Sequence, residues 1–250
     1  MSILSYWLCA TRKATHFISC LVLMVFSVNA TAVEPIKLTT ESYPPFNMIT
    51  RTGVVSGIST DIVREMFKRS QIPVEIEMLP WNRAYGMAQE SPNVGVFSTT
   101  RTSEREKLFK WVSPLTLNNW VFLAKKDRNI RLTSLEDAKK YRIGGYRGDA
   151  IALYLESKGF NLDLVSRDDL NALKLARGRI DLWATGHLLG PYLAKQQRID
   201  GLVDVLTFKE TVMGVAFHPE TSDAVIVRLN TTLQEMYVDG TIDRIFNEYR

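Results

Sequence analysis

Cysteine and histidine are scarce in this chain. Its 250 residues include two cysteines, Cys9 and Cys20, and three histidines. Both cysteines precede residue 33, in a segment that we expect to be removed, so the mature chain has no disulfide bond and no thiol chemistry. Only His187 and His218 follow that segment, and no cluster of acids and histidines has metal-ligand spacing. We therefore expect no metal site and no cofactor.

The chain has no large excess of charge of either sign. It contains 31 Lys and Arg against 27 Asp and Glu, a formal net charge of +4. Arg12 and Lys13 belong to the same N-terminal segment, and the remaining chain has a net charge of only +2. Such a balance gives no support for a nucleic-acid partner. The sequence also lacks internal repeats and low-complexity segments.

The first 32 residues have the pattern of a signal peptide. A basic, acid-free segment precedes an apolar run from Phe17 to Val28, and Ala30-Thr31-Ala32 has the small-x-small pattern of a cleavage site. The run is short for a membrane span. We expect cleavage after Ala32 and export of the mature chain, with an uncleaved anchor as the alternative. Cys20 lies inside the run, which argues against a lipoprotein.

Strand and helix patterns alternate along the rest of the chain and predict an α/β fold. Hydrophobic residues make up 46% of the sequence, enough for a substantial core. In the first half, apolar strands are separated by amphipathic helices, which predicts a parallel sheet with helices on its faces. The expected elements are strands over Ile36–Thr40, Val74–Met78 and Val94–Phe97, and helices from Ser59 or Thr60 to Ser70 and over residues 81–89.

Several polar and aromatic residues follow these strands directly. Tyr43 follows the first strand, Trp81 the second, and the stretch 98–105 the third. Ligands of parallel sheets bind beyond the carboxyl ends of the strands. We therefore expect these residues to lie along one edge of the sheet, around a ligand site.

The stretch from Phe97 to Arg105 combines a strand end, free hydroxyl groups, a helix start and a guanidinium. Thr102 or Ser103 is the expected N-cap of the helix. A helix N-terminus beside an arginine can bind a carboxylate. The alternative is an ordinary capped helix with a solvated Arg105.

The α/β pattern repeats in a second unit from Arg142 to His187. Extended segments precede and follow it, and residues 222–250 have helical spacing without strands of their own, so they must pack on an existing sheet. We therefore expect two crossings between two lobes, near 118–124 and 206–213, which form a hinge and a cleft. Residues 33–120 and 212–250 would form the first lobe and residues 121–211 the second.

At this point the sequence resembles the family 3 extracellular solute-binding proteins of bacterial ABC importers, of the polar amino acid type. The similarity extends over essentially the whole mature chain and is carried by eight short landmarks in register. They are Tyr43-Pro44-Pro45-Phe46, Gly57-Ile58-Ser59-Thr60-Asp61-Ile62, Trp81, Thr100-Arg101-Thr102-Ser103-Glu104-Arg105, Phe109-Lys110-Trp111-Val112-Ser113-Pro114, Arg142-Ile143-Gly144 with Gly148, Gly178-Arg179-Ile180-Asp181 and Asp239-Gly240-Thr241-Ile242.

The resemblance implies a two-lobed type II periplasmic-binding-protein fold with the ligand between the lobes. It implies that Tyr43 and Trp81 sandwich the ligand and that Thr100 and Arg105 hold its α-carboxylate. The helix start at Gly148-Asp149 would supply backbone donors from the second lobe. The further ligand-binding candidates are Ser98 and His187.

The sequence departs from the family pattern at the position of the acid that receives the ligand's α-amine. That position holds Gly186, which has no side chain, and the first-lobe position that often carries an acid holds Thr40. We therefore expect a carboxylate-bearing ligand and leave open whether it has an α-amine. Asp149 is a possible alternative source of negative charge, and Glu41 is another polar candidate for the cleft.

The favoured function is binding of a small solute, by a monomer, for delivery to the membrane permease of an ABC transporter. One alternative is a periplasmic dehydratase or lyase on the same fold, with Glu41, Asp149 or His187 as the acid or base. No P-loop, dinucleotide fingerprint or Ser–His–Asp order is present, so we expect no catalytic residues. The other alternative is a sensor partner that presents its ligand to a membrane receptor.

Overall fold

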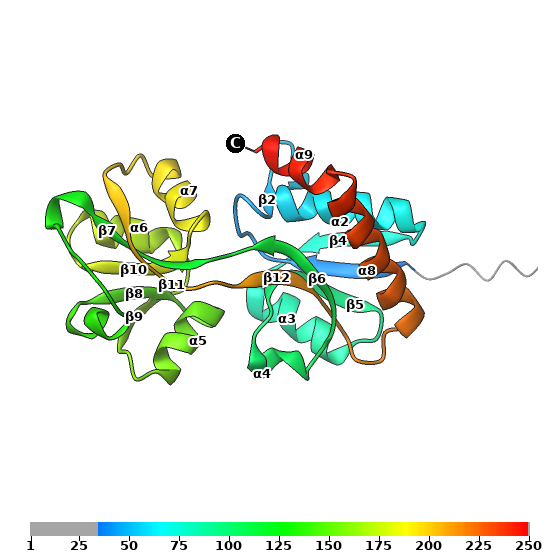
Figure 1. The fold of residues 1–250 in the computed structure, drawn as a ribbon, viewed down its shortest axis with the longest axis horizontal. Coiled ribbons are helices and arrows are strands. Elements are labelled where there is room, and N and C mark those ends of the chain that lie inside the picture. The colour runs from blue at the N-terminus through cyan, green and yellow to red at the C-terminus, as the bar shows by residue number, and fades with distance from the viewer. Residues whose placement is uncertain (1–34, 250) are drawn as a thin grey trace, which may run out of the picture. The chain divides into compact units, whose positions relative to one another are not determined.

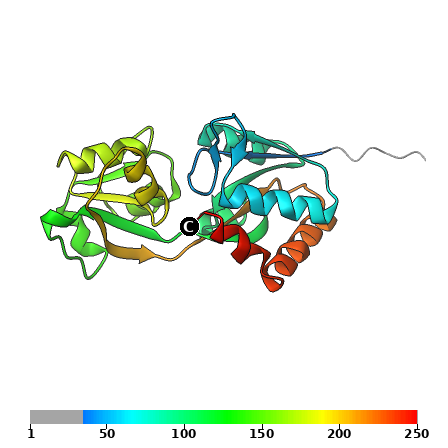
Figure 2. The same cartoon turned by 90° about the horizontal axis from the view of Figure 1, so that it is seen from above.

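The computed structural model describes residues 35–249, which form two α/β lobes, each built on its own five-stranded sheet (Figures 1 and 2). The predicted signal peptide lies outside the described residues. No helix within the described range is long and apolar enough to cross a membrane.

The first sheet has the strand order β4-β1-β5-β12-β6. Its central strand pairs are parallel, β1 with both β4 and β5, as the alternation of strands and helices predicts. Its strands are β1 (Ile36–Thr40), β4 (Val74–Met78), β5 (Val94–Thr100), β6 (Lys110–Leu117) and β12 (Val212–Phe217). The helices and short hairpin of this lobe are α2 (Ile58–Ser70), α3 (Trp81–Glu90), α4 (Ser103–Glu106), β2 (Met48–Ile49) and β3 (Val55–Ser56).

The second sheet has the strand order β11-β7-β10-β8-β9. Parallel pairs join β8 to β9 and to β10, and antiparallel pairs join β7 to β10 and β11. Its elements are β7 (Trp120–Lys125), β8 (Ile143–Tyr146), β9 (Leu162–Val165), β10 (Leu182–Gly186), β11 (Leu202–Lys209), α5 (Ala150–Ser157), α6 (Asp169–Ala176), α7 (Leu189–Gln196) and two short 3-10 helices over Lys126–Arg128 and Glu136–Lys140.

Two segments connect the sheets, one between β6 and β7 and one between β11 and β12 (Figure 1). They are hydrogen-bonded to each other, because the Asn118 N–H donates to the Thr211 carbonyl at 2.8 Å and the Thr211 hydroxyl donates to the Asn118 carbonyl at 2.5 Å. Paired connections of this kind fit a hinge. The exact division of the chain at residues 120 and 212 stays a prediction.

Each sheet has its own apolar core. Leu38, Phe67 and Phe217 are buried in the first lobe, and Phe122 and Leu182 in the second. The face of α2 that the sequence predicts to be apolar is fully buried, with the side chains of Ile62, Val63, Met66 and Phe67 no more than 1% exposed. Burial of this face against the first sheet explains why the segment is helical and where it packs.

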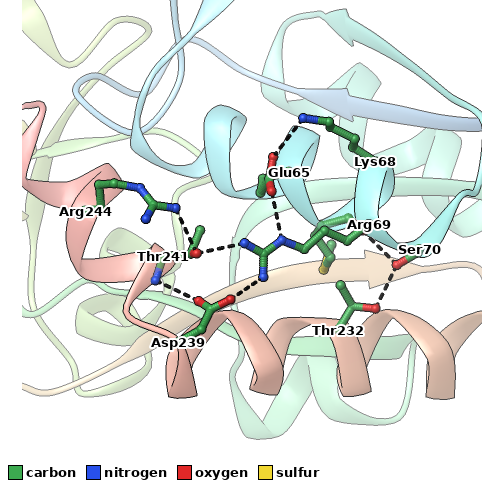
Figure 3. Close-up of polar contacts among 9 residues, drawn as sticks. Glu65, Lys68, Arg69, Ser70, Thr232, Asp239, Thr241 and Arg244 are labelled. Carbon is green, nitrogen blue, oxygen red and sulfur yellow. Dashed lines mark hydrogen bonds and ion pairs between the residues drawn. The ribbon is translucent and has the colours of Figure 1, made fainter.

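The C-terminal helices α8 (Asp223–Val238) and α9 (Thr241–Asn247) pack on the first lobe against α2, as expected for a helix pair without strands of its own. Figure 3 shows the polar contacts that join these helices. Arg69 of α2 donates to Glu65 at 2.8 Å and to Asp239 at 2.5 Å, and Ser70 donates to Thr232 at 3.0 Å. Gly240 separates the two helices with a left-handed φ of 75°.

Some element boundaries differ from the sequence prediction. Helix α2 begins at Ile58 with Gly57 as N-cap, so the expected caps Ser59 and Thr60 lie inside its first turn and are buried. Strand β5 continues to Thr100 because it pairs with β12 over its whole end. Strand β10, which the apolar pattern predicts over residues 180–184, spans Leu182–Gly186.

Candidate functional site

Two cavities share the Trp81 side chain as a wall. The first, of about 570 Å³, contains Glu41 and Asp168 in its lining, and we call it the acidic cavity. The second, of about 420 Å³, is lined by Arg105 and by aromatic side chains that include Trp120, and we call it the aromatic cavity. Residues of both sheets contribute to each cavity, so each one lies between the lobes.

The residues of the acidic cavity come from the carboxyl ends of parallel strands. Glu41 and Tyr43 follow β1, and Trp81 follows β4 and begins α3. In the second lobe, Tyr146 ends β8 and Asp168 follows β9. The strand-end rule therefore places the residues of this cavity correctly in both lobes.

Asp168 has a different role from the one that its position predicts. An aspartate directly before a helix is expected to cap it, and Asp168 does stand at the N-cap position of α6, but its side chain makes no capping hydrogen bond. Its carboxylate instead accepts hydrogen bonds from Asn171 Nδ2 at 2.9 Å, Trp183 Nε1 at 2.9 Å and Thr185 Oγ1 at 3.1 Å. Three donors fix this carboxylate in the lining of the cavity.

Three carboxyl groups of the two lobes influence one another electrostatically. Burial, followed by repulsion from Asp149, raises the pKa of Glu41 to about 8. Burial also raises the pKa of Asp168 to about 7 and that of Asp149 to about 6, although Arg105 opposes the latter shift. No ion pair between residues 35 and 249 involves any of the three. A positive charge placed beside these groups would lower their pKa values and favour their ionised forms.

These shifts predict that the free protein loses stability as the pH rises. The folded chain retains protons on Glu41, Asp149 and Asp168 that the unfolded chain releases near pH 4. The resulting stabilisation is complete below about pH 4 and is lost as the pH rises through the folded-state pKa values of about 6 to about 8. Urea unfolding between about pH 5 and about pH 8.5 should show a fall in unfolding free energy on the order of 1 kcal/mol or more.

The Glu41→Gln variant provides the control for this pH dependence. It removes the carboxyl group with the highest pKa of the three, so the fall should become smaller. An unfolding free energy of the wild-type protein that rises over the same pH range would contradict the assignment.

Arg105 is a buried cation, with 8% of its surface exposed. Of the two residues expected to cap α4, Thr102 is the N-cap. Its hydroxyl accepts a hydrogen bond from the Arg105 backbone N–H at 3.4 Å. The guanidinium donates from Nη1 to the Thr100 carbonyl at 3.2 Å, and its Cζ lies 5.2 Å from the Trp81 ring centre and 5.1 Å from that of Tyr85. A guanidinium has five N–H donors, so most of them remain for a ligand.

The loop before α5 brings the second lobe against the start of α3. Gly148 has a φ of 79°, and a Cβ atom there would lie 3.4 Å from Asn82 Oδ1 and 3.9 Å from Trp81 Cδ1. A glycine therefore suits both the backbone conformation and the close approach. Asp149 follows Gly148. Burial raises the pKa of Asp149, and the positive charge of Arg105 opposes this shift. Asp149 is not among the residues that line the two cavities.

The position of Gly186 is already filled by a side chain from the hinge. A Cβ atom at this position would lie 2.5 Å from Asn118 Oδ1 and 3.2 Å from the Tyr43 hydroxyl oxygen. Asn118 is buried and donates from Nδ2 to Tyr43 at 3.2 Å. The lack of an acid at Gly186 therefore has a steric cause, and the carboxyl groups in the lining of the acidic cavity are at other positions, among them Glu41 and Asp168.

Gly186→Ala is expected to lower the free energy of unfolding by about 1–3 kcal/mol, because the new methyl group overlaps Asn118. Gly86 in α3 offers a matched control, since a Cβ atom there meets nothing within 4 Å. Gly86→Ala should raise stability by about 0.5–1 kcal/mol through its higher helix propensity. Chemical denaturation of both variants tests this, and equal effects would contradict the steric account.

The structure brings only some of the predicted ligand-binding residues together. Tyr43 and Trp81 line the acidic cavity, and Trp81, Arg105 and Gly148 line the aromatic cavity. Ser98, Thr100 and His187 line neither of them.

Ser98 and Thr100 have places within the fold, whereas the buried Nδ1 of His187 has no hydrogen-bond partner among the described residues. Ser98 donates to Asn47 Oδ1 at 2.7 Å, Thr100 is 6% exposed, and the His187 backbone N–H donates to the Asn119 carbonyl at 2.9 Å. Burial lowers the pKa of His187. Their part in ligand binding stays a prediction.

Sequence reasoning missed Asp168 and Tyr146 in the acidic cavity and Trp120 and Lys209 in the aromatic cavity. The first pair follows or ends a predicted strand, so the strand-end rule that selects Tyr43 would have found them too. The second pair lies on the segments that connect the lobes, where no periodicity or motif marks a ligand contact.

Comparisons with known proteins agree with this architecture. Residues 36–250 match the family model for bacterial extracellular solute-binding proteins, family 3. The ABC transporter arginine-binding protein 1 of Escherichia coli K12 is 25% identical over 236 residues, which cover 90% of this chain and 94% of the relative. The L-cystine-binding protein TcyJ of the same strain is 22% identical over 211 residues, which cover 83% of this chain and 79% of that relative.

Solved structures show the same fold at low sequence identity. An ancestral arginine-binding protein bound to arginine superposes with a TM-score of 0.73 at 23% identity, over 86% of this chain and 97% of its own. A histidine kinase sensor domain with similarity to periplasmic binding proteins gives a TM-score of 0.78 at 19% identity, over 86% and 95% of the two chains.

Proposed function

Since the chain belongs to the bacterial extracellular solute-binding proteins, family 3, we propose that it captures a small solute with both a carboxylate and a cationic group. Capture would take place in the periplasm, and the loaded protein would deliver the solute to the permease of an ABC importer. Among the curated relatives are arginine-binding and L-cystine-binding proteins, whose ligands are amino acids.

The observation that carries the proposal is the unpaired buried guanidinium of Arg105. Among residues 35–249 it forms no ion pair, and its one side-chain hydrogen bond is to the Thr100 carbonyl. Asp149 acts on this guanidinium electrostatically but forms no ion pair with it, so a bidentate ligand carboxylate would be its direct counter-ion. The ring of Trp81 lies against the guanidinium and would form the apolar wall beside the bound carboxylate.

The acidic cavity supports the cationic half of the proposal. Glu41 and Asp168 line it, burial raises the pKa of both groups, and neither forms an ion pair among the described residues. A ligand cation placed between them would favour their ionised forms. We assign the carboxylate to Arg105 and the cation to the acidic cavity, with Tyr43 and Trp81 as the aromatic walls.

Closure of the lobes would complete the site. Tyr146 of the second lobe donates its hydroxyl to Glu41 Oε2 of the first at 3.2 Å, so a ligand contact of Glu41 is coupled to a contact between the lobes. Ligand binding then favours the closed form by its differential affinity. A micromolar dissociation constant corresponds to about 8 kcal/mol, which a few charge-assisted hydrogen bonds and one aromatic wall can supply.

The proposal includes binding without turnover. Glu41 is the group that a lyase on this fold would use, because a pKa of about 8 keeps a carboxylic acid protonated at neutral pH. One structural relative is an ancestral amino acid-binding protein that is a precursor of cyclohexadienyl dehydratase, with a TM-score of 0.73 at 20% identity. Proton NMR of a bound amino acid after prolonged incubation should show the unchanged compound, and any product would favour the lyase.

A thermal-shift screen tests the proposed ligand class. L-arginine and L-lysine carry both charged groups, agmatine lacks the carboxylate, and L-citrulline lacks the cationic side chain. We expect the first two to raise the melting temperature of the mature protein more than the last two, because stabilisation follows affinity. Equal stabilisation by agmatine would contradict the carboxylate assignment, and equal stabilisation by L-citrulline the cation assignment.

A further inference from the structure

We propose that the aromatic cavity is a second binding subsite, which accepts an acidic group carried on an apolar or aromatic body. Its polar recognition elements are the Lys209 ammonium group and the Trp120 indole N–H, which the proposed function does not use. The subsite therefore stands on observations of its own.

Trp120 has a buried hydrogen-bond donor without an acceptor. The side chain is 0% exposed and lines the aromatic cavity, and its Nε1 has no hydrogen-bond partner among the described residues. Aromatic contacts fix the ring, with centre distances of 5.5 Å to Tyr154 and 6.3 Å to Phe208. Buried indole N–H groups normally have a partner. An oxygen acceptor bound in the cavity would provide the missing one.

Lys209 adds a positive charge beside this donor. Its Nζ lies 4.2 Å from the Tyr154 ring centre and 4.8 Å from that of Trp120, and no carboxylate among residues 35–249 pairs with it. The charged residues that line the cavity are Lys209, Arg105 and Glu104. Glu104 is exposed, and hydrogen bonds from Thr102 and Ser103, with a smaller contribution from Lys209, lower its pKa. Two cations and one exposed acid therefore line the cavity, which leaves a net positive charge.

The remaining walls are mostly apolar. Leu108, Leu153, Tyr85 and Tyr154 contribute to a cavity of about 420 Å³, large enough for a benzene ring with a short acidic side chain. In the lining of the acidic cavity on the other side of Trp81, carboxyl groups outnumber basic groups, so that cavity suits an anion less well. Charge and shape together therefore select an anion with an apolar body for this cavity.

Two sources could supply this chemistry. The acidic group could be a second one on the solute bound at Arg105, or it could belong to a separate aryl or alkyl acid. Both would place an anionic oxygen near Lys209 and Trp120, and only the first would compete with a carboxylate bound at Arg105.

Phenylacetate is a suitable probe, with uncharged phenylacetamide as its matched control. In nitrogen-15 NMR spectra of the mature protein, the Trp120 indole resonance is assigned through its contacts with Tyr154 and Phe208. We expect phenylacetate to shift this resonance in a saturable way, and phenylacetamide to bind at least tenfold more weakly. An unmoved Trp120 resonance, or equal effects of acid and amide, would overturn the proposal.

Variants at Lys209 test the role of its charge. Lys209→Met keeps the alkyl stem over the rings and should weaken phenylacetate binding at least tenfold, whereas Lys209→Arg should retain most of it. Equal affinity in the Met variant would count against the subsite. Lys125→Met, in a lysine paired with Asp127 elsewhere in the second lobe, is the matched control.

L-arginine separates the two sources and keeps the two proposals apart. If saturating L-arginine displaces phenylacetate, the subsite extends the main ligand site through Arg105, and if both bind together, it serves a separate acid. The thermal shift with L-arginine is recorded on the same samples. Loss of that shift with a retained phenylacetate response would contradict the proposed function alone.

Discussion

Replacement of Arg105 by methionine is expected to weaken L-arginine binding by about 100-fold or more. Two hydrogen bonds to a charged carboxylate contribute about 1.5–3 kcal/mol each, and every 1.4 kcal/mol is a factor of ten. Methionine retains an apolar stem against Trp81, so the melting temperature of the free protein should change little. Isothermal titration calorimetry of wild type and variant gives both affinities. Agmatine, which lacks the carboxylate, should bind the two proteins equally.

Arg101 provides the matched control for this substitution. It lies four residues earlier, pairs with Glu106 through hydrogen bonds of 2.7 and 2.5 Å, and has its Cζ 5.6 Å from the Trp111 ring centre. Arg101→Met should therefore leave L-arginine affinity within about twofold, as expected for an exposed ion pair. Equal losses in both variants would show a structural effect, and no loss in Arg105→Met would remove Arg105 from the site.

Glu41→Gln should weaken L-arginine binding by about tenfold and leave L-citrulline binding unchanged. The glutamine amide oxygen can still accept the hydrogen bond from Tyr146, so the substitution removes mainly the charge. The loss follows from the attraction between the ligand cation and an ionised Glu41, an interaction that neutral L-citrulline lacks. Calorimetric titrations at about pH 8, the pKa of Glu41 in the free protein, provide the comparison.

Titrations with L-arginine near pH 7 should also detect a release of protons on binding. A bound cation lowers the raised pKa values of Glu41 and Asp168, so L-arginine binding near pH 7 should release protons into the buffer. Measured heats should then depend on the ionisation enthalpy of the buffer, and less so in Glu41→Gln. Glu77→Gln is the matched control, because Glu77 forms an exposed ion pair with Lys37 at 2.7 Å. Heats that are independent of the buffer in the wild type would contradict the cation site.

The sequence was sufficient to predict the regular parts of the fold. Apolar periodicity placed α2 and its buried face, and strand spacing predicted the parallel core of the first sheet. The helix pair at the C-terminus could be assigned to the first lobe because it has no strands of its own. The predicted N-cap of α2 was wrong, because Gly57 occupies the N-cap position and the hydroxyl residues Ser59 and Thr60 lie inside the first turn.

The candidate site was only partly predictable, for physical reasons that particular residues show. Asp168 has the position of a helix cap, and only the packing of Trp183 and Thr185 against it reveals that its carboxylate is held in the cavity lining. Gly186 lacks a side chain, but the side chain that fills its space, Asn118, lies 68 positions earlier in the sequence. Contacts between residues so far apart depend on strand pairing, here of β7 with β10, which no local pattern specifies.

A crystal structure of the mature protein with L-arginine tests the central claim most directly. We predict the ligand carboxylate at about 2.7–2.9 Å from the Arg105 guanidinium nitrogens, as in charge-assisted hydrogen bonds. The ligand's guanidinium should lie in the acidic cavity, within hydrogen-bond distance of Glu41 or Asp168. A ligand bound in the reverse orientation, or one that leaves Arg105 without a carboxylate partner, would contradict the account.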